Sequence, residues 1–138
     1  MGFTGLGDPL QITRIEVMEL AYNNVQAGEA VNAYQVVFLD GAFWLRADAS
    51  NSARARPPIA IAQDTVTSGQ LMDAWMKAIV SNGAWSLASG LRCFLGSGPG
   101  NIVTSAPTAS GNISLLLGWA VTPQTLEFSP AQPVTIAA

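Results

Sequence analysis

The sequence predicts an all-β protein: a small antiparallel β-sandwich or barrel-like domain that follows an irregular N-terminal arm and contains at most one short helix. The first observation is that residues 90–130 consist of short apolar runs separated at close intervals by Gly, Pro, Asn and Ser, which is typical of strands joined by turns. The second is that Asp40-Gly41 separates two runs rich in β-branched and aromatic residues, which indicates a hairpin.

Composition bounds the size and the surface of this domain. The chain has 138 residues, enough for one domain with a substantial core, which we assign to residues 11–138 after an arm at residues 1–10. Only 11% of the residues are charged, against roughly 25% in a typical soluble domain, although 49% are hydrophobic. We therefore expect other subunits to cover much of the surface; the alternative is a monomer covered by neutral polar side chains.

The first elements are the least regular. Residues 1–10 contain three glycines and a proline without periodicity, and we expect an arm that is either mobile or ordered against a partner. Residues 11–22 fit neither the helical nor the strand period cleanly, and in an otherwise β chain they are predicted to form a strand. A turn at Asn23-Asn24 and a loop at residues 27–29 follow.

The clearest hairpin pairs residues 34–39 with residues 42–47 across Asp40-Gly41. Asp-Gly suits a type I′ turn, whose two central residues both need positive φ. The β-branched and aromatic residues on both sides supply cross-strand pairs. A polar loop at residues 48–58 and a strand at residues 59–63 come next.

A similar layout is expected for the next segment, with a strand at residues 70–80, a turn at Asn82-Gly83 and a further run at residues 84–87. A short helix remains open for residues 70–80, because apolar residues recur there at every fourth position. These residues are Leu71, Trp75 and Ile79.

The last third of the chain is predicted to contain four strands. Their ranges are residues 91–95, 102–104, 113–121 and 125–128, with a turn at 96–100 and a loop at 106–111. The turn is glycine-rich, but Pro99 removes a backbone N–H and no Lys follows, so it does not fit a phosphate-binding loop.

Catalytic chemistry has little support in the residue types present. The sequence contains no histidine, which removes the usual general base and the commonest metal ligand. Cys93 is the single cysteine, so an internal disulfide is excluded and a zinc site lacks ligands. Two carboxylate pairs, Glu16 with Glu19 and Asp40 with Asp48, suggest glycoside hydrolysis in principle, but nothing fixes either pair at a working separation. We therefore predict no enzymatic activity, no catalytic residues, no cofactor and no metal.

Charge and hydropathy argue against nucleic acid and membrane as partners. The net charge is −3, and only Arg54 and Arg56 lie close together, in a loop where they are either solvated or in contact with an acidic partner. The longest apolar run, residues 115–121, is far shorter than the ~20 residues that cross a bilayer. The N-terminus lacks the basic start and apolar core of a signal peptide, so we expect synthesis in the cytoplasm.

Four tryptophans are candidates for packing or for binding sugars. We expect them to fill the core or a subunit interface, because each ring buries a large area. The alternative, a surface that stacks on sugar rings, needs two or more of them exposed on one face. The four are Trp44, Trp75, Trp85 and Trp119.

Residues 83–130 follow an ordered series of turn glycines, aromatic residues, short strands and prolines. The pieces are Gly83-Ala84-Trp85, Gly90-Leu91-Arg92-Cys93-Phe94-Leu95, Gly98-Pro99-Gly100-Asn101-Ile102-Val103-Thr104, Pro107, Leu117-Gly118-Trp119-Ala120-Val121-Thr122 and Leu126-Glu127-Phe128-Ser129-Pro130. This series resembles a pattern that recurs in small virion proteins of tailed bacteriophages. Residues 27–31 and 39–44 also suit such proteins, whereas the arm is unmatched. Arg92-Cys93 and Thr122-Pro123 differ from the commoner versions of the pattern.

The resemblance implies a structural protein of the virion. Its expected role is that of a cement or decoration protein, bound as a trimer to the major capsid protein on the outer surface of the head, which it stabilises. The same module occurs in tail-fibre parts, so the alternative is a tail-fibre or baseplate module that binds host-surface glycan; a protein unrelated to virions is the third possibility. The candidate interface residues are Gly2, Phe3, Leu6, Pro9 and Leu10 of the arm, together with Arg54 and Arg56.

Overall fold

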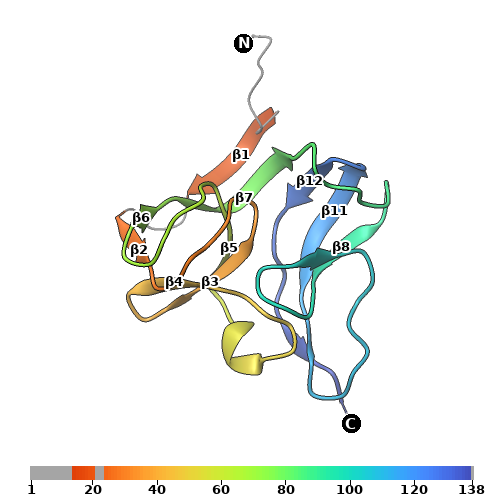
Figure 1. The fold of residues 1–138 in the computed structure, drawn as a ribbon. Helices are drawn as coiled ribbons and strands as arrows, with labels where there is room; N and C mark the ends of the chain where they lie inside the picture. The colour runs from red at the N-terminus through yellow and green to blue at the C-terminus, as the bar shows by residue number, and fades with distance from the viewer. Residues whose placement is uncertain (1–13, 21–23, 138) are drawn as a thin grey trace.

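The computed structural model of this chain describes residues 14–20 and 24–137 (Figure 1). This part of the chain consists of strands and loops with one 3-10 turn, Ser52–Arg54, which confirms the all-β prediction. The predicted arm, with its five candidate interface residues, lies outside the described residues. The strands are β1 (Arg14–Leu20), β2 (Val25–Ala27), β3 (Val36–Asp40), β4 (Phe43–Arg46), β5 (Ile59–Ala62), β6 (Leu71–Met72), β7 (Ala74–Ser81), β8 (Arg92–Leu95), β9 (Ile102–Val103), β10 (Ile113–Ser114), β11 (Leu116–Thr122), β12 (Thr125–Phe128) and β13 (Val134–Thr135).

Eleven strands join in one sheet. Its spatial order is β6-β2-β4-β3-β5-β7-β12-β11-β8-β9, with β1 also paired to β7, and β10 and β13 form a separate pair. Among the described strands every pairing is antiparallel except that of β2 with β4, which is parallel. The sheet bends so that β3 and β5 face β8, β11 and β12 across buried side chains, which is the sandwich arrangement that the sequence predicts.

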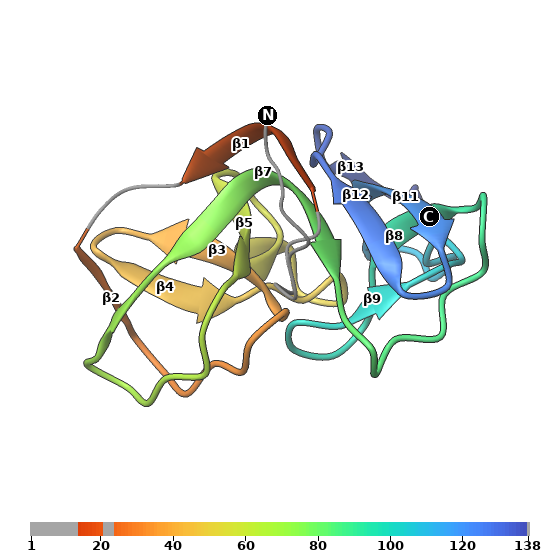
Figure 2. The ribbon, with the colours of Figure 1, turned by 90° about the horizontal axis from the view of Figure 1, so that it is seen from above.

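Two clusters of buried side chains fill the molecule. The first lies between the two faces of the bent sheet and includes Phe38, Leu95 and Leu126. The second lies on the other side of β3 and β5 and includes Trp44 and Met72. Because successive side chains of a strand point to opposite faces, β3 and β5 contribute to both clusters. Figure 2 shows two lobes, one with β3, β4 and β5 and the other with β8, β11 and β12, and β7 pairs with β5 of the first lobe and with β12 of the second.

Residues 70–80 form β6 and most of β7, not a helix. The spacing of four residues in this segment fits a strand as well as a helix, because four is a multiple of the two-residue strand repeat. Pairing decides between the two: Trp75 is paired with Ile61 of β5 and with Leu20 of β1, so both edges of β7 are joined to other strands.

The β3–β4 hairpin forms as predicted, but its turn type was predicted wrongly. Asp40 pairs with Phe43, which leaves Gly41 and Ala42 as the two turn residues. Only Gly41 has positive φ, +62°, whereas a type I′ turn needs positive φ at both central residues. A glycine at the first central position is instead the arrangement of a type II′ turn, which also matches the twist of the strands.

The run at residues 84–87 does not pair with β7, so the expected similarity to the β3–β4 hairpin is absent. The side chain of Asn82 accepts a hydrogen bond from the Ala84 N–H at 3.0 Å, and the Asn82 carbonyl oxygen accepts one from the Trp85 N–H at 3.0 Å, so the chain turns away from β7. The edge of β7 is then free to pair with β12.

The number of strands differs from the prediction at three further places, two in the C-terminal third of the chain and one near the N-terminus. The run at residues 113–121 is divided at Leu115 into β10 and β11, and the short strands β2 and β13 were not predicted. β2 and β13 are too short to carry a periodicity, so only their pairing with β4 and β6, and with β10, identifies them.

Candidate functional site

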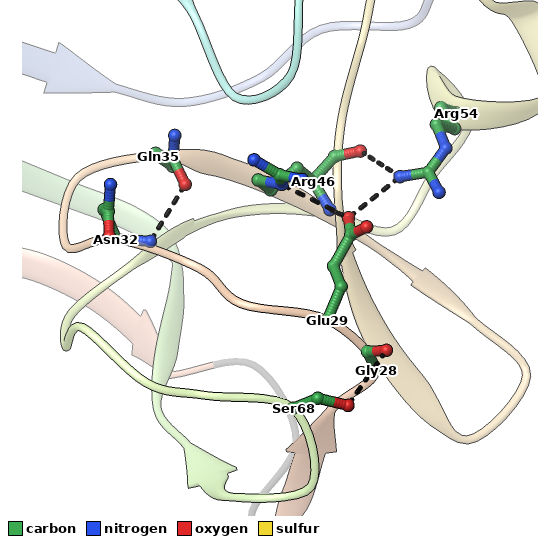
Figure 3. Close-up of polar contacts among 7 residues, drawn as sticks. All are labelled: Gly28, Glu29, Asn32, Gln35, Arg46, Arg54 and Ser68. Atoms are coloured by element: carbon green, nitrogen blue, oxygen red, sulfur yellow. Dashed lines mark hydrogen bonds and ion pairs between the residues drawn. The ribbon is translucent and has the colours of Figure 1, made fainter.

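Glu29 brings two arginines together at the base of the 48–58 loop (Figure 3). Its Oε2 accepts hydrogen bonds from the Arg46 backbone N–H at 2.8 Å and from Arg54 Nη1 at 2.9 Å, and it lies 3.4 Å from Arg46 Nε. Partial burial raises the pKa of the Glu29 carboxyl, but the hydrogen bonds outweigh burial and hold this pKa below its ordinary value. Arg54, a predicted interface residue, is therefore engaged within the chain.

Arg56, the second predicted interface residue of this loop, lies at the surface. Its Nη2 donates a hydrogen bond to Asp40 Oδ1 at 2.9 Å, and its guanidinium carbon lies 5.3 Å from the centroid of the Phe38 ring. Both side chains of the ion pair are 50% exposed. Exposed pairs contribute little to stability, so the guanidinium is available to a partner carboxylate at small cost. A role of Arg56 in an interface stays a prediction.

Asp48 joins the polar loop to the glycine turn at residues 96–100. Its Oδ1 accepts hydrogen bonds from the Ser50 N–H at 2.9 Å, the Ser50 hydroxyl at 2.6 Å and the Gly98 N–H at 3.0 Å. Partial burial raises the pKa of the Asp48 carboxyl. The hydrogen bonds outweigh burial and hold this pKa below its ordinary value. The backbone of the glycine turn therefore has a structural role, because its Gly98 N–H is hydrogen-bonded to the polar loop through Asp48.

The other groups considered for chemistry also serve the fold. Cys93 is fully buried, and burial raises the pKa of its thiol. Asp40 and Asp48 have separate structural partners, and the side chains of Glu16 and Glu19 are not described. Among the described side chains of residues 24–137, no three Asp, Glu, Cys or His gather closely enough to bind a metal ion. No helix in this part of the chain is long and apolar enough to cross a membrane.

Three of the four tryptophans are used in packing. Trp44 is fully buried in the second cluster. Trp75 donates from Nε1 to Gln63 Oε1 at 2.6 Å, and Trp85 packs edge to face on Tyr34 with 5.5 Å between ring centroids. Trp119 is the exception, since it is 45% exposed.

Trp119 lies in a row of outward-facing residues across three strands, which we call the Trp119 row: Arg92, Trp119 and Glu127. Trp119 is paired with Arg92 of β8 on one side and with Glu127 of β12 on the other. The Arg92 guanidinium carbon is 5.3 Å from the centroid of the Trp119 ring, a cation–π contact. Val121, which lies two residues after Trp119 in β11, is 52% exposed. Leu91, whose carbonyl oxygen accepts from the Ala120 N–H, adds exposed apolar surface beside this row.

A second row lies at the other end of the sheet, and we call it the Phe43 row: Phe43, Gln26 and Leu71. Gln26 of β2 is paired with Phe43 of β4 and with Leu71 of β6. Phe43 is 43% exposed and Leu71 is 58% exposed, whereas the next residues along these strands, Trp44 and Met72, are buried in the second cluster. This face of β4, β2 and β6 therefore presents apolar side chains to solvent.

Grooves open at the surface of the described part of the chain, and two of them lie near the strands discussed above. A groove of about 570 Å³ runs beside β9 and the glycine turn, and no charged side chain lines it. A second, of about 300 Å³, lies over Met76 and Lys77 and is walled by Pro57, Pro58 and Pro130. The second groove has a simple cause. β5 and β12 pair with different parts of β7, at residues 74–75 and 78–81, and leave a gap between them.

Neither row was identified from the sequence. Each joins residues of three strands, so it depends on strand register, which the sequence does not state. The alternation of side chains along a strand was the one signal that pointed to the outward-facing residues. Cys93 and Leu95 face the core, which places Arg92 and Phe94 on the outside.

Comparison with protein-family models, with curated proteins and with solved structures finds no match to this chain.

Proposed function

We propose that this protein is a structural component of tailed-bacteriophage virions: a decoration, or cement, protein that binds the outer surface of the head and stabilises it. The observation that carries the proposal is a β domain with only 11% charged residues that exposes apolar side chains near both ends of its sheet: Phe43 and Leu71 at one end, Trp119 and Val121 at the other. Among the described side chains, Lys77 and Arg92 are the only cations without an ion pair. Exposed apolar patches on a soluble domain usually mark a protein interface.

The proposed partner comes from the resemblance in residues 83–130. That resemblance implies binding to the major capsid protein and a trimeric arrangement. On this proposal the protein is made in the host cytoplasm, acts on the capsid surface, and needs no catalytic residue, cofactor, nucleic acid or membrane. Unpaired sheet edges, such as that of β9, are also covered when subunits assemble, which removes a risk of aggregation.

The Phe43 row is the surface that we assign to the shell. Asp40, the partner of the predicted interface residue Arg56, is paired with Phe43 at the end of the β3–β4 hairpin. The exposed ion pair and the apolar row therefore form one surface, an apolar centre with a charged rim, as interfaces commonly have. The arm at residues 1–10 would add contacts to the same shell.

The first experiment measures the copy number of the protein in purified virions of its source phage, by quantitative mass spectrometry against the major capsid protein. A simple ratio to the shell protein supports decoration of the head. A few copies per particle would assign the protein to the tail, and absence from the particle would contradict the proposal.

The second experiment tests the contact surface with capsids that lack this protein. We expect the double variant Phe43→Ser, Leu71→Ser to bind such capsids at least roughly tenfold more weakly, because central apolar contacts dominate binding. Val134→Ser is the matched control, since Val134 is equally exposed but lies in β13. Deletion of residues 1–10 should also weaken binding; unchanged binding would remove the arm from the proposal.

No observation favours the alternative of a glycan-binding tail module. Sugar recognition by stacking needs two or more exposed tryptophans on one face, and Trp119 alone is exposed. The Arg92 guanidinium also lies over its ring.

A further inference from the structure

The Trp119 row carries opposite charges on its two sides. Arg92 stands one strand away from Trp119 in β8, and Glu127 stands one strand away on the other side in β12. Because neighbouring strands lie about 4.8 Å apart, the two charged residues are separated by roughly 10 Å across the sheet. Neither forms an ion pair within the described part of the chain. The row is therefore a cation, an aromatic ring and an anion in line on an exposed face.

We propose that the Trp119 row is a self-association surface, on which a second copy of this chain packs face to face about a two-fold axis roughly parallel to β11. Such an axis places Trp119 opposite Trp119 and exchanges the two sides of the row. Arg92 of each copy then faces Glu127 of the other copy. Facing sheets commonly align within about 30°, which fits this axis. The contact is isologous, because the same patch serves both copies.

The side chains of the row suit the centre of an interface. Trp and Arg are enriched at such centres, where they contribute most of the binding free energy. The planar guanidinium of Arg92 can remain stacked on Trp119 while the N–H groups at its rim donate to a carboxylate. Phe94 and Leu116, which are paired and half-buried, extend the apolar surface to one side of the row, and Val121 extends it to the other.

This inference does not rest on the proposed function. The two-fold contact also differs from the three-fold contact that the resemblance implies, and the two are compatible: if both form, the assembly is a hexamer. Loss of the two-fold contact should therefore halve the mass of the assembly, whether or not the three-fold contact also forms.

The test is a charge exchange, read by light scattering or sedimentation at matched concentrations. We expect a wild-type mass that is an even multiple of the chain mass. Arg92→Glu alone and Glu127→Arg alone should each halve it and raise the dissociation constant of the two-fold contact at least roughly tenfold, because like charges then face each other. The double variant Arg92→Glu, Glu127→Arg should restore the wild-type mass. Asp64→Arg, a charge reversal at an exposed site away from the row, should leave the mass unchanged.

Two outcomes would overturn the proposal: a wild-type mass that is an odd multiple of the chain mass at every concentration, or a double variant as dissociated as the single ones. A third measurement does not depend on charge reversal. The two-fold axis places Val121 opposite Val121 of the other copy, so Val121→Cys should be cross-linked by a bismaleimide of roughly 10 Å span, the usual distance between facing sheets. Val134→Cys, at a similarly exposed valine of β13, should not be. Equal yields from the two variants would contradict the two-fold contact.

Discussion

Gly118 lies so close to Glu127 that a Cβ atom at position 118 would overlap the carbonyl oxygen of Glu127. Its φ of +147° is also a value that residues with a side chain rarely adopt. Gly118 is paired with Cys93 on one side and with Phe128 on the other, so β11 is held between β8 and β12 at this point. The glycine therefore permits a close approach of backbones beside the Trp119 row.

Gly118→Ala should destabilise the fold by about 2–6 kcal/mol. The reason is the sum of backbone strain, about 1–3 kcal/mol, and overpacking, about 1–3 kcal/mol. Urea unfolding measures the loss. Gly83→Ala is the control, because Gly83 has no positive φ and a Cβ there meets nothing within 4 Å; its effect should stay within about 1 kcal/mol. Equal losses in the two variants would contradict the role of Gly118.

Truncation of a core leucine should be far more costly than truncation of a leucine in the Phe43 row. Leu126 is fully buried in the first cluster, so Leu126→Ala should lower the free energy of unfolding by about 2–5 kcal/mol. Leu71 is largely exposed, and Leu71→Ala should change stability by less than about 1 kcal/mol. The comparison uses chemical denaturation of both variants. A large loss at Leu71 would mean that this residue serves the fold and not an interface.

The strands that could be predicted are apolar or alternating runs bounded by turn residues. Thr125–Phe128 was predicted with its bounds, because Leu126 and Phe128 alternate with polar neighbours and a turn precedes them. The helix alternative for β7 could not be settled locally, since a spacing of four fits both structures. What excluded the helix was pairing with β1, β5 and β12, three strands from distant parts of the chain.

The residues that lie on the candidate surfaces were harder to predict from the sequence than the strands. Arg54 and Arg56 are alike in the sequence and lie two positions apart, yet Arg54 is held by Glu29 whereas Arg56 remains at the surface. Glu29 lies 25 residues away from Arg54, and no local signal links them. Trp119 stood out only as one of four tryptophans, and its exposure follows from the register of β11 between β8 and β12.

Cys93 should be unreactive toward thiol reagents in the native protein. It is fully buried, and burial raises the pKa of its thiol, so both access and thiolate content are low. Labelling with a chromogenic disulfide should therefore proceed only as the protein unfolds, and its rate should rise with denaturant. Ser105→Cys adds a thiol at an exposed position and should react at once with one equivalent of reagent. Rapid reaction of wild-type protein would show that the first cluster opens readily.

The ion-pair cluster at Glu29 should make the free energy of unfolding decrease as the pH falls into the acid range. The pKa of Glu29 is lower in the folded protein than its ordinary value of 4.5. The contribution of the carboxylate is therefore fully present above about pH 4.5, and it is lost as the pH falls through the folded pKa. Glu29→Gln keeps the shape and one acceptor oxygen but removes the charge. At neutral pH we expect it to lower the free energy of unfolding by about 1–2 kcal/mol, a value reduced from that of a buried charged hydrogen bond because Glu29 and its arginines are partly exposed.

The difference between wild type and Glu29→Gln, measured by urea unfolding across the acid range, should shrink as the pH falls below about 4.5. Taking the difference removes the titration of every other carboxylate, since both proteins share them. Asp40→Asn breaks the exposed pair with Arg56 and should cost no more than about 1 kcal/mol at neutral pH. A difference for Glu29→Gln that stays constant with pH would mean that the cluster acts through its shape and hydrogen bonds alone, because a neutral glutamine would then lose the same free energy at every protonation state of Glu29.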